Sequence, residues 1–101
     1  MKEIEFKINE MENHTVIYFE LENTIAPESL EKIEPPKVNG TKGVILSGRG
    51  PIWLYCFLTH HYHPTKFVAI YDPRLGGAVV VESHTSGLKV GDLILMKSEV
   101  G

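Results

Sequence analysis

The stretch that decides the fold runs from Gly43 to Tyr55 and reads Gly-Val-Ile-Leu-Ser-Gly-Arg-Gly-Pro-Ile-Trp-Leu-Tyr. Its opening is an apolar run, which is typical of a short strand buried on both faces of an α/β sheet. Pro51 suits the first turn of a helix, because its φ is already fixed near the helical value and its missing N–H would have no partner there. The sequence therefore predicts a strand, a glycine-rich turn and a helix in immediate succession.

The same pattern continues toward the C-terminus. Pro64 is expected to end the helix at about His63, because the residue before a proline avoids the helical conformation. The apolar run from Phe67 to Tyr71 then predicts a second strand. A strand, a helix and a strand over about 30 residues form a βαβ unit, in which the strands are parallel and the crossover is right-handed.

Shorter elements are predicted on both sides of this unit. Polar and apolar residues alternate over 2–8 and 14–21, which favours an N-terminal hairpin. Residues 25–33 are predicted to form one short helix, ended by the double proline that follows. A Val-rich strand over 78–82 is expected to run antiparallel to its predecessor, and a last strand covers 90–96.

Together these elements predict a small α/β domain, with a mixed sheet, one central βαβ unit and antiparallel flanking strands. At 101 residues the chain is expected to form a single domain over 1–101. Hydrophobic residues make up 43% and charged residues 23%, which is ordinary for a globular protein. We expect a cytoplasmic protein without a membrane partner, because there is no long apolar stretch, no signal-peptide core and a single cysteine.

The net charge of −3 bears on the ligand. Proteins that grip long nucleic acid usually carry a basic surface, because phosphate contacts dominate that affinity. We therefore expect no DNA partner, and a small nucleotide held in a focused pocket. Trp53, Tyr55 and Tyr62 could stack on its bases, but at helical spacing among apolar neighbours they are expected to pack in the core or a dimer interface.

The predicted turn consists of Ser47, Gly48, Arg49 and Gly50. Such a turn directs free backbone N–H groups and the positive end of the helix dipole at one spot, which favours a phosphate. Arg49 adds a planar, bidentate anion clamp. The turn is neither a Walker A loop nor a dinucleotide fingerprint, because the spacing differs and the third glycine is absent. The alternative is that the glycines serve only the tight connection.

Asp72-Pro73-Arg74 ends the second strand of the βαβ unit. Ligands of α/β sheets collect at the carboxyl ends of the strands, so the two turns are expected to face one crevice if their strands are neighbours. Asp72 and Arg74 would then place a carboxylate and a guanidinium at that crevice. The alternative for Asp72 is an ordinary Asx turn.

Three histidines, His60, His61 and His63, close the predicted helix. His60 and His63 share a face and are candidates for a general acid or base on a ribose hydroxyl, or for metal ligands. The alternative is a favourable position at the negative end of the helix. His84 is expected at the opposite sheet edge from Asp72, so that a symmetric dimer or a stacked pair of dimers, and not one subunit, would assemble both.

From Gly43 onward the chain resembles the small stand-alone CRISPR-associated proteins of type III systems known as ring nuclease 3. The matching segments cover about half of the chain in the expected order. They are Gly48–Tyr55 (GRGPIWLY), His60-x-x-His63-Pro64, Ala69–Val81 (AIYDPRLGGAVVV) with the following Glu82-Ser83-His84, and Val90-Gly91-Asp92-Leu93-Ile94. The residues before Gly43 contribute only a compatible strand pattern.

The resemblance implies a minimal, Rossmann-like relative of the CRISPR-associated sensors that works as a homodimer, with two dimers sandwiching the ligand. Members bind four-nucleotide RNA and degrade cyclic tetra-adenylate, the second messenger of type III defence, with a requirement for manganese. The likeness thus implies a Mn²⁺-dependent phosphodiesterase, a ribonuclease that switches off antiviral signalling.

The likeness also implies roles for individual residues. The expected catalytic residues are His63, Asp72, Arg74 and His60. The expected phosphate or RNA contacts are Ser47, Gly48, Arg49, Gly50 and His84. Asp72 and His63 are the expected ligands of Mn²⁺.

Two other functions fit the same residues. A non-catalytic binder of short RNA or cyclic oligoadenylate would use the same phosphate-gripping turns without turnover. A manganese-dependent 3′ deadenylating exoribonuclease would act from a free 3′ end and spare circular substrates, and the acidic net charge counts against it.

Overall fold

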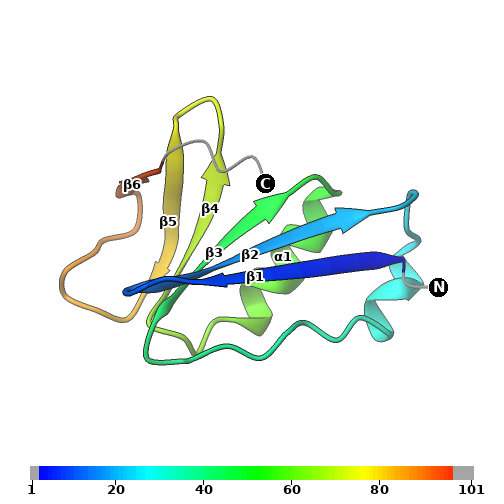
Figure 1. Ribbon diagram of the computed structural model, residues 1–101, viewed down its shortest axis with the longest axis horizontal. Coiled ribbons are helices and arrows are strands. Elements are labelled where there is room, and N and C mark those ends of the chain that lie inside the picture. Colours follow the sequence, from blue (N-terminus) through cyan, green and yellow to red (C-terminus); the bar gives the residue numbers. More distant parts are fainter. Residues whose placement is uncertain (1–2, 97–101) are drawn as a thin grey trace.

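A computed structural model describes residues 3–96 of the chain. It contains one mixed sheet of six strands, whose spatial order β1-β2-β3-β4-β5-β6 is the order of the sequence (Figure 1). The strands are β1 (Ile4–Glu10), β2 (His14–Leu21), β3 (Gly43–Gly48), β4 (Phe67–Asp72), β5 (Gly77–Ser83) and β6 (Leu93–Leu95). The helices are the 3₁₀ helix η1 (Pro27–Glu31) and α1 (Ile52–His61).

The centre of the sheet is parallel and its flanks are antiparallel. β3 pairs with β2 on one side and β4 on the other, in both cases parallel, whereas β1–β2, β4–β5 and β5–β6 are antiparallel pairs. The predicted mixed sheet, N-terminal hairpin and central βαβ unit are therefore confirmed. The predicted α/β class is also confirmed. A doubly wound, Rossmann-like sheet reverses its strand order at one point, whereas the strands of residues 3–96 follow one another in sequence order.

The connection from β2 to β3 is a second parallel crossover, which the sequence did not predict. The predicted helix over 25–33 is reduced to the 3₁₀ helix η1, and an extended segment continues from it to β3. Proline at the start of η1 and the double proline beyond it leave little room for a longer helix. The hydroxyl of Tyr62 donates to the carbonyl of Pro36 at 2.5 Å and fixes this segment beside α1.

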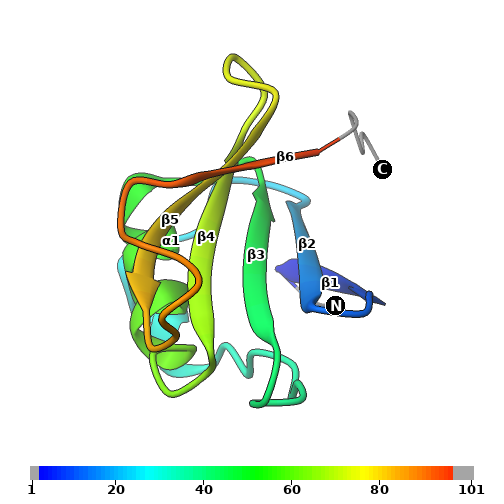
Figure 2. The same cartoon turned by 90° about the vertical axis from the view of Figure 1, so that its left-hand side faces the viewer.

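Two apolar layers lie on the two faces of the sheet. α1 covers one face of the sheet (Figures 1 and 2). There Leu54 and Leu58 pack against residues of β2, β3 and β4. On the other face, called here the helix-free face, Ile45, Ala69 and Val80 form a second buried cluster. All of Val44, Ile45 and Leu46 are 0% exposed, which confirms that β3 is buried on both faces.

α1 differs slightly from its predicted bounds. Pro51 is the N-cap, with φ −67° and ψ 155°, and the helix begins at Ile52. It ends at His61, so His63 lies in the turn beyond it. Within residues 3–96, no helix is long and apolar enough to cross a membrane.

Candidate functional site

The carboxyl ends of β3 and β4 lie side by side. Leu46 pairs with Ile70 in a parallel register, so the turn after β3 and the turn after β4 leave the sheet at one edge. β3 continues through Ser47 and Gly48, and β4 ends at Asp72, so the turns begin at Arg49 and Pro73. The two segments leave the same edge, but Asp72 and Arg74, expected at one crevice with Ser47 and Arg49, do not line the groove that opens there.

A groove of about 940 Å³ opens at this edge. Its lining includes Ser47 on β3 and Arg49 just after it, Tyr71 on β4 and Pro73 just after it, and Tyr18 on β2. The volume lies within the range of small-molecule sites, roughly 300–1,000 Å³. We call it the edge groove. It is the part of the described chain where the predicted phosphate-binding turn meets open space large enough for a nucleotide.

The turn after β3 is held by packing as well as by its backbone. A Cβ added at Gly48 would lie 2.4 Å from the carbonyl oxygen of Phe19, so glycine is required there by close approach. The hydroxyl of Tyr55 donates to the carbonyl of Gly48, while burial raises the pKa of Tyr55 and this hydrogen bond opposes the rise. The alternative of a structural role is thus confirmed for Gly48, and Arg49 remains exposed beside it.

The first turn of α1 stands directly behind Arg49. No side chain of the described residues caps it, so the leading N–H groups of the helix have no side-chain acceptor. These groups and the positive end of the helix dipole add to the guanidinium of Arg49 at the same edge. No residue of α1 lines the edge groove itself, so the helix end and Arg49 favour an anion at this edge beside the groove.

Asp72 and Arg74 form a compact pair at the end of β4. The carboxylate of Asp72 accepts the backbone N–H of Arg74 at 2.9 Å and its guanidinium at 3.1 and 3.3 Å. Hydrogen bonds from the Arg74 side chain, and then from its backbone, lower the pKa of Asp72. The predicted Asx turn is present, and both carboxylate oxygens are already engaged. Gly76, with φ 68°, lets the chain turn back into β5.

The aromatic residues of α1 mainly pack. Tyr62 is buried, and Tyr55 lies edge-to-face on Phe19 with ring centroids 5.0 Å apart. Trp53 packs partly buried against the same core. The expectation of packing for these three residues is confirmed.

The histidines of α1 lie at the opposite edge of the sheet. α1 runs back from the end of β3 to the start of β4, so His60 and His63 precede β4 while Asp72 ends it. The six residues of β4 span about 16 Å at the usual rise of a strand. The predicted metal pair of Asp72 and His63 is therefore wrong for a single chain, because the two side chains belong to different edges.

His63 instead meets Glu82 and His84. The Nδ1 atom of His63 contacts the Glu82 carboxylate, and Nε2 of His84 donates to the His63 carbonyl at 3.0 Å. The two imidazole rings are 4.9 Å apart, edge to face. One ligand atom from each of the three side chains lies within 4.8 Å of the others. We call these three residues the histidine cluster.

Glu82 was not predicted, and a β-bulge explains why. Val68 pairs with Glu82 but Ala69 pairs with Val80, so one extra residue of β5 interrupts the ladder. Strict alternation from Val80 would send Glu82 to the helix-free face, whereas the bulge turns it toward the α1 side, where His63 lies. The sequence around Val81 carries no glycine or proline that signals this shift.

The remaining predicted residues divide between the two edges. His84 lies with His63 at the edge opposite Asp72, as predicted. It was also expected to contact phosphate, but it does not line the edge groove. Within one chain it therefore shares no pocket with Ser47 or Arg49. His60 is exposed on α1 and lies outside the histidine cluster.

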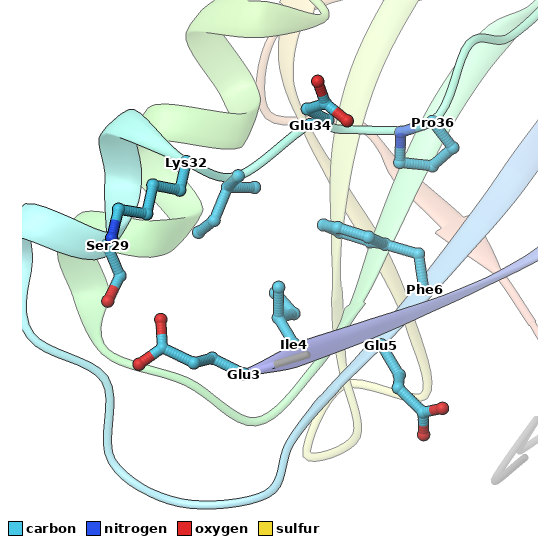
Figure 3. A pocket seen from close by; sticks show the side chains of 9 residues that line it. Glu3, Ile4, Glu5, Phe6, Ser29, Lys32, Glu34 and Pro36 are labelled. Atoms are coloured by element: carbon cyan, nitrogen blue, oxygen red, sulfur yellow. The ribbon is translucent and has the colours of Figure 1, made fainter. Parts of the chain in front are cut away.

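A second hollow, of about 510 Å³, lies between β1 and η1 (Figure 3). Ile4 and Phe6 point into it from β1, and Glu3, Lys32 and Glu34 stand at its sides (Figure 3). None of the predicted site residues lines it.

The structure defines a small α/β domain with a groove at the carboxyl ends of β3 and β4, and comparison with known proteins narrows this class. The model of the family CRISPR-associated protein (Cas_csx3) matches residues 18–95, so the chain belongs to that family. It is also similar to an uncharacterised protein of Aquifex aeolicus (strain VF5), with 55% identity over 92 residues, 87% of this chain and 81% of the relative.

Proposed function

We propose that this protein binds cyclic tetra-adenylate at the edge groove and cleaves it, as a ring nuclease that switches off type III antiviral signalling. The observation that carries the proposal is the convergence of Arg49, the uncapped first turn of α1 and the Asp72–Arg74 pair at one sheet edge. Membership of a CRISPR-associated family supports the choice of ligand. The proposal includes that the chain is a ring nuclease 3 and a relative of the Rossmann-like CRISPR-associated sensors.

The chemistry needs few groups from the protein. The 2′-oxygen of a ribose attacks the adjacent phosphorus, the bond from phosphorus to the 5′-oxygen breaks, and a 2′,3′-cyclic phosphate and a 5′-hydroxyl result. A base must take the 2′-hydroxyl proton and an acid must protonate the leaving oxygen. In this proposal Arg49, which lines the edge groove, stabilises the charge that develops on the phosphate oxygens. Arg74 would join it from the same sheet edge, although its side chain does not line the groove. Asp72, ionised at neutral pH, holds the guanidinium of Arg74 in place.

The imidazole groups that the proposal uses must come from another chain. Within residues 3–96 of one chain, the histidine cluster and the edge groove lie at opposite edges of the sheet. We therefore place the His63 edge of one protomer against the edge groove of another, in a homodimer or in two dimers that sandwich the ring. A ring of four equal nucleotides matches such a symmetric assembly through repeated copies of one site.

The histidine cluster also fits Mn²⁺. Two imidazoles and one carboxylate offer nitrogen and oxygen donors that this ion accepts, and their ligand atoms are close enough to converge. His63, Glu82 and His84 would hold the ion, which supplies Lewis-acid polarisation of a phosphoryl oxygen when bound. One imidazole nitrogen does not serve as metal ligand and proton carrier at once, so a strict manganese requirement favours the ligand role for His63.

A second candidate is a binder that does not cut. The separation of the histidine cluster from the edge groove favours it, because a single chain then holds the anion site without a nearby imidazole. This protein would sequester or sense cyclic oligoadenylate.

The test is to incubate the purified protein with cyclic tetra-adenylate, with and without Mn²⁺, and to resolve the products by chromatography and mass spectrometry. Linear di-adenylates that form only with Mn²⁺ are the expected result. An intact ring that co-elutes with the protein supports the binder. An intact ring that does not bind contradicts both candidates.

A further inference from the structure

Tyr18 and Tyr71 flank Ser47 across the helix-free face of the sheet. Tyr18 is the register partner of Ser47. Leu46 pairs with Ile70, which makes Ser47 and Tyr71 the next residues along β3 and β4. All three line the edge groove, and both tyrosines are partly exposed. Two aromatic side chains are thus placed beside the phosphate-binding turn.

The spacing of these tyrosines suits an oligonucleotide. β3 separates β2 from β4, so the two tyrosine backbones are about 10 Å apart, twice the distance between neighbouring strands. Two bases of a splayed oligonucleotide can therefore rest on separate rings. Stacking on an aromatic ring is open to every base because each has a π-face.

The charges of the edge groove are unevenly distributed. Its cations are Arg49 at the turn after β3 and Lys7 on β1, whereas Glu5 and Glu20 lie on β1 and β2 and face each other directly in the register. Like charges in this position cost stability, which Lys7, two residues from Glu5 on the same face of β1, offsets in part. The exocyclic amino group of adenine would donate to such carboxylates, whereas uracil presents two carbonyl acceptors there and has its donor only at N3–H between them.

We propose that Tyr18 and Tyr71 are base-stacking residues of the edge groove, and that Glu5 and Glu20 give it a preference for adenine. The phosphates then face Ser47 and Arg49. This inference rests on the proposed function, because it takes an oligoadenylate as the ligand, and it adds residues that read the bases.

The test measures binding to the full-length protein in the presence of EDTA, by calorimetry, with cyclic tetra-adenylate, linear tetra-adenylate and linear tetra-uridylate. Tyr71→Leu and Tyr18→Leu should each weaken adenylate binding by about 5- to 150-fold, the range expected from loss of one stacked base. Tyr71→Phe and Tyr18→Phe keep the ring and should bind as the wild type does. Tetra-uridylate should bind more weakly than tetra-adenylate.

A second measurement needs no variant. Tetranucleotides with 2-aminopurine in place of one adenine should lose fluorescence when they bind the wild-type protein, because the base analogue stacks on a tyrosine. Unchanged fluorescence on binding, or leucine variants that bind as tightly as the wild type, would overturn the inference.

The outcomes also separate the inference from the proposed function. Cleavage with tyrosine-independent binding overturns the stacking role alone. Tyrosine-dependent binding without cleavage supports the stacking role and contradicts ring cleavage. Failure of the wild-type protein to bind any of the three oligonucleotides overturns both.

Discussion

Asp72 and His63 lie at opposite ends of β4, Asp72 as its last residue and His63 in the turn that precedes it. Each has its own partner at its own edge, Arg74 for Asp72 and Glu82 for His63. The chain therefore carries two polar sets that no side-chain rotation brings together. A reaction that uses both requires two copies of the chain.

The backbone at Gly48 should tolerate no side chain. Gly48→Ala would place a Cβ 2.4 Å from the carbonyl oxygen of Phe19, and we expect a loss of about 1–3 kcal/mol in the free energy of unfolding, as for overpacked sites. Gly40→Ala is the matched control, since nothing lies within 4 Å of its Cβ. Urea unfolding of both variants measures the difference. Equal stability of the two would contradict the close packing of the turn.

The pKa of Asp72 should depend on Arg74. Hydrogen bonds from Arg74 lower this pKa in the folded protein, so the pair stabilises the fold at pH values above the unfolded-state pKa of Asp72. That contribution is lost as the pH falls through the lowered, folded-state value. Asp72→Asn should therefore reduce Tm at neutral pH and leave it unchanged in strong acid.

A direct readout is the ¹³C carboxyl titration of Asp72 by NMR. In Arg74→Ala the midpoint should move upward, toward the ordinary value of an aspartate, because the donors on the Arg74 side chain are gone. An identical midpoint in the wild type and the variant would show that Arg74 does not hold this carboxylate in solution.

Glu82 should be needed for Mn²⁺ binding. Glu82→Gln removes the carboxylate ligand of the histidine cluster. The affinity for Mn²⁺ should fall by more than the roughly 10- to 100-fold that follows loss of a residue hydrogen-bonded to a metal ligand. Glu28→Gln, an exposed carboxylate on η1, is the control. Titration of free Mn²⁺ by electron paramagnetic resonance measures both. Unchanged affinity in Glu82→Gln would place the ion elsewhere.

Removal of one carboxylate from the Glu5–Glu20 pair on β1 and β2 should stabilise the fold and weaken the preference for adenine. Glu20→Thr removes one of two like charges that face each other, and we expect a gain of about 0.2–1 kcal/mol in the free energy of unfolding. The preference for tetra-adenylate over tetra-uridylate should fall in the same variant. Glu12→Thr, in the β1–β2 turn, should change neither quantity. A loss of stability with unchanged base preference would assign Glu20 a purely structural role.

Local pattern was enough to predict most of the fold. The apolar run at the start of β3, the proline at each end of the α1 segment and the alternation in β1 and β2 each depend on near neighbours in sequence. The meeting of the turns after β3 and β4 followed from the geometry of a parallel pair.

What could not be predicted depends on contacts between distant segments. The bulge that turns Glu82 toward His63 is set by how β5 pairs with β4, and no residue in the local sequence signals it. The expected helix over 25–33 became η1 and an extended segment, which Tyr62 holds through Pro36. His63 and Asp72 were expected to bind one Mn²⁺, but the direction of α1 sends them to opposite edges.

The most direct test of a site shared between two chains is complementation of two inactive variants. Asp72→Asn and His63→Gln are each expected to leave cyclic tetra-adenylate intact in the presence of Mn²⁺. After subunit exchange in an equal mixture, about a quarter of the contacts between protomers should join an intact edge groove to an intact histidine cluster. Cleavage should therefore return to about that fraction of the wild-type rate. A mixture that stays inactive, although exchange is shown by native mass spectrometry, would contradict a site built from two chains.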